Sequence, residues 1–100
     1  MNELCLTLLC PPAVEEKVLD LLLLTPEVTS YTSNPTSAHG IAPDNLDESE
    51  QVLGRARATL VLAVFGADAQ ASLLARLAAE LRGSGVRYWI TPILASGGFA

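Results

Sequence analysis

The candidate ligand-binding residues of the sequence lie mainly between residues 35 and 57. Arg55 and Arg57 are alternate residues of an expected strand, so both guanidinium groups are expected on one side of it. From there they could converge on one carboxylate or phosphate. His39 is the only histidine and precedes a run of acidic residues, a set that suits copper or zinc. The pattern predicts anion recognition, with metal binding as the alternative.

Catalytic arrangements find no support in the sequence. His39 has no cysteine nearby and no second histidine at ligand spacing, so neither a nucleophilic pair nor a zinc set can be drawn. Pro11 and Pro12 have no backbone N–H groups to cradle a phosphate after the first strand. Cys10 stands alone where a metallochaperone needs a Cys-x-x-Cys pair. We therefore expect that the protein is not an enzyme, and that Cys5 and Cys10 are free thiols.

Composition limits the classes of partner. Six Lys and Arg against eleven Asp and Glu give a net charge of -5, which argues against nucleic acid. The longest apolar runs, Leu21–Leu24 and Leu60–Phe65, are far too short to span a bilayer, and Leu4–Leu9 lacks the positive flank of a signal peptide. We expect a single cytoplasmic domain over residues 1–100, with no insertion into the membrane.

Apolar periodicity and turn residues predict the order strand, helix, strand, strand, helix, strand. Strands are expected over residues 3–10, 28–34, 55–65 and 86–94, with one helix from Pro12 to before Pro26 and another between Asp68 and Gly83. Pro35 is expected to end the second strand, and Asp68 to cap the second helix. This order packs as a four-stranded antiparallel sheet with both helices on one face, the ferredoxin-like α+β sandwich.

The central strand is apolar on both of its sides. Its even residues are Leu60, Leu62 and Val64, and its odd residues are Val61, Ala63 and Phe65. Because helices cover only one face of such a sheet, the other face is expected to be buried against further subunits. A closed ring such as a homotrimer would satisfy this symmetrically. A charge at Val61 or Ala63 is expected to dissociate or unfold the assembly.

The connection Pro35–Gly54 is longer than two adjacent strands require, which favours a functional or disordered loop. It contains His39 and the acidic residues Asp44, Asp47, Glu48 and Glu50. Asp47 and Glu50 have the spacing of a capping box, so a short helix is expected over Glu48–Leu53. Arg55 and Arg57 follow directly.

Four segments resemble a family of small PII-like proteins of proteobacteria. They are Cys10-Pro11-Pro12, Ala38-His39-Gly40, Glu50 to Arg55, and Tyr88 to Leu94. The resemblance covers nearly the whole chain. Such proteins are often encoded beside heavy-metal efflux systems, and their superfamily includes the PII signalling proteins and the CutA divalent-cation-tolerance proteins.

The resemblance implies a trimer with three clefts between subunits and a T-loop, Pro35–Gly54, that reports a bound effector to a partner protein, with a membrane transporter as one candidate. The implied ligand-binding residues are Gly40, Gln51, Gly54, Arg55, Arg57 and Arg87. Nucleotide-binding PII proteins hold the phosphates of ATP with a longer, lysine-containing connection before the last strand. That connection is missing here, because Arg82–Gly85 is short and Lys17 is the only lysine. Three arginines could still hold a small anion, or a nucleotide in another pose. The alternative is a CutA-like metal-binding protein that uses His39 and the loop carboxylates, with Cys10 as a further candidate ligand.

Overall fold

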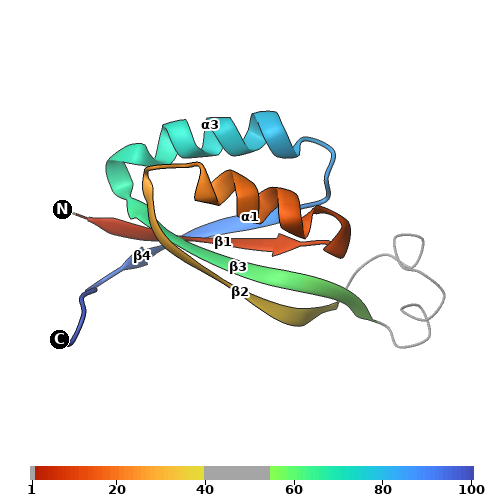
Figure 1. Ribbon diagram of the computed structural model, residues 1–100, viewed down its shortest axis with the longest axis horizontal. Coiled ribbons are helices and arrows are strands. Elements are labelled where there is room, and N and C mark those ends of the chain that lie inside the picture. Colours follow the sequence, from red (N-terminus) through yellow and green to blue (C-terminus); the bar gives the residue numbers. More distant parts are fainter. Residues whose placement is uncertain (1, 40–54) are drawn as a thin grey trace.

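A computed structural model describes residues 2–39 and 55–100 of the chain. Four strands form one sheet in these residues: β1 (Glu3–Cys10), β2 (Val28–His39), β3 (Arg55–Gly66) and β4 (Arg87–Ile93). Their order in space is β2-β3-β1-β4, and every neighbouring pair is antiparallel. Both helices lie on one face of this sheet (Figure 1). The expected ferredoxin-like βαββαβ sandwich is confirmed, and it is the PII-like arrangement.

The first helix follows from its spacing of apolar residues. A 3₁₀ turn, η1 (Pro12–Val14), leads into α1 (Glu15–Leu23), which buries Val18 and Leu22 on successive turns. Glu15 and Glu16 lie in the first turn, where the helix dipole favours negative charge. The Thr25 hydroxyl donates a hydrogen bond to the Leu21 carbonyl at 2.6 Å, and the helix ends before Pro26 as predicted.

The second helix is reached through another 3₁₀ turn, η3 (Ala67–Ala69), and α3 (Gln70–Leu81) then buries Leu73 and Leu77. The prediction that Asp68 caps this helix is wrong. Asp68 lies inside the 3₁₀ turn, and no side chain caps either η3 or α3. Gly83 follows the helix with a φ of 75°, the left-handed conformation expected of a glycine after a helix end. In the described residues no helix is long and apolar enough to cross a membrane.

The predicted boundaries of β2 and of the loop after it need correction. β2 continues through Pro35 to His39, so Pro35–His39 belongs to the sheet and not to the loop. Pro35 pairs with Thr59 of β3 and β2 has an open outer edge, so a residue without an N–H is tolerated there. The remaining predictions for the loop, including the helix over 48–53, concern residues 40–54 and lie outside the described residues.

The core lies between the sheet and the helices. On the central strands, Leu6, Leu8, Val61, Ala63 and Phe65 are at most 1% exposed, and they pack with Val18, Leu22 and Leu73 of the helices. Their sequence neighbours Leu60, Leu62 and Val64 lie on the helix-free face and are only half-buried. The helix-covered face is thus completed within one chain, and the other face is not.

Candidate functional site

The end of the β2–β3 ribbon is the part of the molecule where candidate ligand-binding residues gather. β1 pairs with β3 as far as Cys10 and Thr59, whereas β2 and β3 continue to pair beyond that point as far as His39 and Arg55. The last part of the ribbon is therefore two-stranded and projects beyond the rest of the sheet (Figure 1). On this projection the side chains of Ser37, His39 and Arg57 are exposed, whereas Ala38 and Ala58 are buried.

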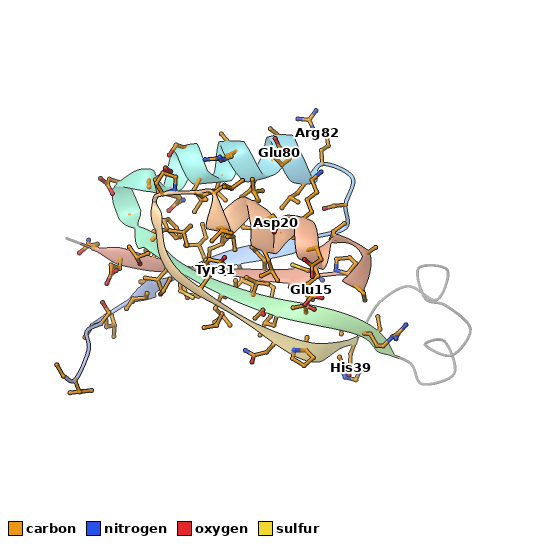
Figure 2. All side chains as sticks on the ribbon, viewed as in Figure 1. Glu15, Asp20, Tyr31, His39, Glu80 and Arg82 are labelled. Atoms are coloured by element: carbon orange, nitrogen blue, oxygen red, sulfur yellow. The ribbon has the colours of Figure 1, made fainter. Side chains whose placement is uncertain are left out.

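His39 and Arg57 both occupy this projecting end. His39 is exposed and pairs with Arg55, while Arg57 is exposed and pairs with Ser37. Figure 2 shows His39 beside the end of the ribbon, well away from the helices. The structure therefore brings together His39 and Arg57, and the backbone of Arg55 pairs directly with that of His39. Gly40, Gln51 and Gly54 lie outside the described residues, so their predicted roles stay predictions.

Arg87 does not join this group within one chain. It is exposed at the start of β4 and pairs with Leu9 of β1, which places it on the helix-free face. Arg57 lies on the other face, in the row that continues Thr59 and Val61, and β1 separates β3 from β4. Within one chain the two arginines therefore lie on opposite faces of the sheet and on strands that are not neighbours.

A small polar cluster lies where the projecting ribbon leaves the helix-covered face. The Thr59 hydroxyl donates a hydrogen bond to Oε1 of Glu15 at 2.9 Å. Cys10, the strand partner of Thr59, is completely buried. Burial raises the pKa of the Cys10 thiol to about 11, and the charge of Glu15 adds to the rise. A protonated, inaccessible thiol is a poor nucleophile and a poor metal ligand, so Cys10 is a core residue and not a candidate ligand or nucleophile.

The predicted metal site receives only His39 from the described residues. Among residues 2–39 and 55–100, no three His, Cys, Asp or Glu side chains lie close enough together to hold a metal ion. Cys5 and Cys10 are free, as expected, but neither lies at the ribbon end with His39. The carboxylates predicted to join His39 fall within 40–54, outside the described residues.

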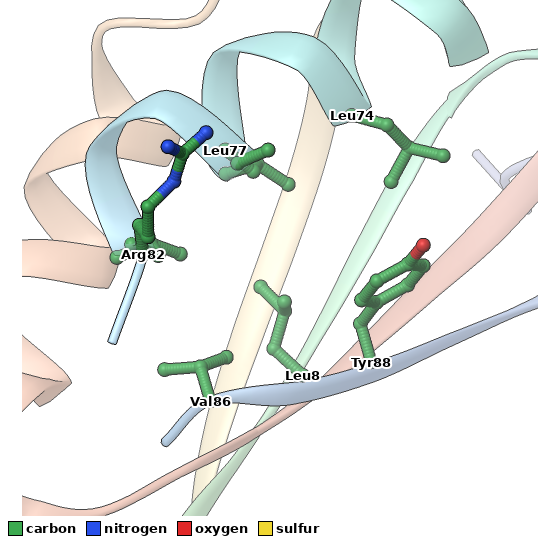
Figure 3. A pocket seen from close by; sticks show the side chains of 8 residues that line it. Leu8, Leu74, Leu77, Arg82, Val86 and Tyr88 are labelled. Carbon is green, nitrogen blue, oxygen red and sulfur yellow. The ribbon is translucent and has the colours of Figure 1, made fainter. Parts of the chain in front are cut away.

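Sequence reasoning missed an apolar pocket at the opposite edge of the sheet. A cavity of about 280 Å³ opens between α3 and the β1–β4 edge. Figure 3 shows Leu74 and Leu77 of α3 above Leu8, Val86 and Tyr88, with Arg82 at one side. Tyr88 is 55% exposed although it is large and apolar. The only signal in the sequence was an aromatic residue on a strand that turns out to be an edge strand.

Comparisons with known proteins agree with this architecture. A crystal structure of a DUF3240 family protein from Shewanella baltica OS155 is 20% identical, with a TM-score of 0.82 over 100% of this chain and 99% of that one. CPII, a nitrogen regulatory PII-like protein from Thiomonas intermedia K12, is 15% identical, with a TM-score of 0.73 over 99% of this chain and 98% of that one. The CPII structure contains ADP, AMP and bicarbonate. At these identities the likeness establishes the fold alone.

No curated protein matches the sequence. The model of one family, described as "Protein of unknown function (DUF3240)", matches residues 1–100 and so spans the chain. The prediction of a small, uncharacterised family with a PII-like fold is thereby confirmed: the fold is that of the PII-like proteins, and the chain belongs to the DUF3240 family.

Proposed function

We propose that this protein is a PII-like regulator, and not a catalyst, that binds a small anionic effector between subunits and signals to a partner protein. The observation that carries the proposal is the group at the ribbon end, where exposed Arg57 and His39 lie together on strands that project from the sheet. An exposed guanidinium on a rigid strand suits recognition of a carboxylate, bicarbonate or phosphate group. The likeness to CPII, which was solved with two nucleotides and bicarbonate, supports an effector of this class.

The assembly in this proposal is a homotrimer that buries the helix-free face of the sheet. Leu60, Leu62 and Val64 on β3 continue through Thr7 on β1 to Trp89 on β4, which is 45% exposed. An apolar surface of this extent on an isolated chain favours contact with other copies. In a closed ring Arg87, which lies on this face, could approach the ribbon end of the next subunit.

The output of the proposed regulator is contact with a target protein. Residues 40–54 connect His39, at the end of β2, to Arg55, at the start of β3, so an effector bound at the ribbon end would bind close to both ends of this connection. This segment is the T-loop that the resemblance implies. The same resemblance suggests a membrane transporter as the target, contacted on its cytoplasmic side.

Metal sensing is the less favoured function. It would depend on His39 together with residues outside the described ranges, and Cys10 is unavailable because it is buried and protonated. Zinc titration of wild type and His39→Ala separates the two functions. Equal zinc affinity in the two proteins would show that His39 is not a metal ligand.

The proposal is tested by calorimetric titration of the purified protein with AMP, ADP and bicarbonate. Replacing Arg57 by Ala is expected to weaken binding about tenfold or more, because a charge-assisted hydrogen bond contributes about 1.5–3 kcal/mol. Arg76→Ala is the matched control, since Arg76 is an equally exposed arginine on α3. Arg76→Ala should bind like wild type, and both variants should keep the wild-type mass in light scattering.

Two results would contradict the proposed site. If Arg57→Ala dissociates the assembly, Arg57 is an interface residue. If all three ligands fail to bind wild type, or if Arg57→Ala binds them as tightly as wild type does, the arginine at the ribbon end recognises no anion of this class.

A further inference from the structure

The segment after β4 forms an arm that extends away from the rest of its own chain. Leu94 is 98% exposed, and Phe99 is fully exposed. Nothing lies within 4 Å of the position a Cβ atom would take at Gly97 or Gly98. One contact holds the base of the arm, a hydrogen bond that the Ser96 hydroxyl donates to the Glu3 carboxylate. Phe99 is therefore an exposed aromatic side chain on an arm that has no charged side chains.

The pocket between α3 and the sheet edge has the properties of a receptor for such a side chain. Its lining is mainly apolar, with Leu74, Leu77, Val86 and Tyr88 around the space shown in Figure 3. An apolar cavity of about 150 Å³ is enough to hold a benzene ring, and this one measures about 280 Å³. Tyr88 offers an aromatic neighbour, and aromatic pairs contribute beyond the area they bury.

In the structure the arm of a chain does not enter the pocket of the same chain, because Phe99 is fully exposed. The pocket includes Tyr88, five residues before Ile93 at the end of β4, a distance of roughly 17 Å along an extended strand. The backbone of the arm beyond the Ser96–Glu3 contact spans three residues to Phe99, about 10 Å. Glu3 pairs with Ile93, so that contact lies at the far end of β4. The arm therefore begins at the opposite end of β4 from Tyr88 and extends away from α3 (Figure 1).

We propose that the arm is exchanged between copies of this chain, with Phe99 of one protomer inserted in the α3–β4 pocket of the next. A second copy is the occupant that fits, because each chain carries one arm and one pocket on different sides. When its rotation closes, such a head-to-tail contact gives a ring in which no arm and no pocket is left over. The inference rests on the assembly in the proposed function, but not on the effector.

The test is disulfide trapping between singly substituted chains. Phe99→Cys and Ala78→Cys are made separately in a Cys5→Ser background, and Cys10 is kept because it is completely buried. Ala78 lines the pocket, and its neighbour Ala79 is equally exposed but does not, so Ala79→Cys is the matched control. After the two chains are mixed and mildly oxidised, Phe99→Cys with Ala78→Cys is expected to give a covalent dimer on a non-reducing gel. Phe99→Cys with Ala79→Cys should give far less.

A second measurement uses the strength of assembly. Phe99→Ala is expected to raise the concentration at which the oligomer dissociates about tenfold or more, because one buried Phe is lost from every contact. Phe99→Leu, which keeps most of the apolar area, should restore most of the wild-type value. Circular dichroism of each variant should stay native, since the arm makes no contact with the core.

Each outcome decides one point. A monomeric wild type would defeat the proposed assembly together with the arm exchange. An oligomeric wild type in which no disulfide forms, or in which Ala79→Cys reacts as well as Ala78→Cys, would overturn the arm exchange alone. A disulfide that forms only inside a chain carrying both Phe99→Cys and Ala78→Cys would show that the arm folds back, and would also overturn it.

Discussion

The two faces of the sheet have nearly the same apolar composition but differ in how deeply they are buried. Val61, Ala63 and Phe65 of β3 are completely buried under the helices, while Leu60, Leu62 and Val64 on the same strand are half-buried on the other side. Both sets are aliphatic or aromatic, so hydrophobicity alone does not distinguish them. What distinguishes them is whether the chain supplies its own cover. The first face stabilises the protomer, and the second is available to stabilise an assembly.

The largest effect should come from a charge on the helix-covered face. Val61→Asp is expected to cost more than about 5 kcal/mol, comparable with the whole stability of a small domain, because the carboxylate would be buried without a partner. The sequence allowed either dissociation or unfolding at this position, and burial of Val61 against the helices selects unfolding. The measurement is the far-ultraviolet circular dichroism of the purified variant. A native spectrum with normal thermal melting would contradict the assignment of faces.

A charge one residue away should separate assembly from folding. Leu62 lies on the helix-free face between Thr7 of β1 and Thr32 of β2, and it is half-buried in one chain. Leu62→Asp is expected to leave the circular dichroism native and to reduce the mass in light scattering to that of one chain. An unchanged oligomer would mean that this face is not the interface, and the proposed assembly would be wrong.

The smallest expected effect is a loss of stability at high pH, which tests whether Cys10 is sealed at the edge of the helix-covered face. The raised pKa of Cys10 means that its thiol stays protonated in the folded protein up to about pH 11, while the unfolded chain loses the proton near pH 9. Below pH 9 both states hold the proton. Stability should therefore fall as pH rises from 9 to 11, by about 2–3 kcal/mol from this group. Denaturant unfolding at several pH values measures the fall.

The controls for the pH experiment are the two cysteine variants. Cys10→Ala is expected to be less stable at neutral pH but to lose less stability between pH 9 and pH 11 than wild type does. Cys5→Ala keeps the buried thiol and should show the wild-type loss. If Cys10→Ala shows the full loss, other titrating groups cause it, and Cys10 is not sealed in the core.

The sequence by itself determined most of the fold. The order of elements, the antiparallel sheet and the ends of β1 followed from alternating apolar residues and from Gly and Pro at the turns. These signals are local, and each is read within a few residues. Two local predictions failed. Pro35 is tolerated because β2 is an edge strand, which depends on tertiary position. Asp68 lies inside a 3₁₀ turn that precedes the helix, so it does not stand at the helix cap.

The tertiary structure decided which side of each strand faces the helices, because a period of two gives two alternating sets and does not say which is covered. It therefore assigned Val61 to the core and Leu62 to the open face. It also placed Arg57 beside His39 and away from Arg87, a separation that depends on strand order and not on sequence distance. The pocket beside Tyr88 exists only because α3 and β4 meet at one edge of the sheet. No local pattern carries such long-range relations.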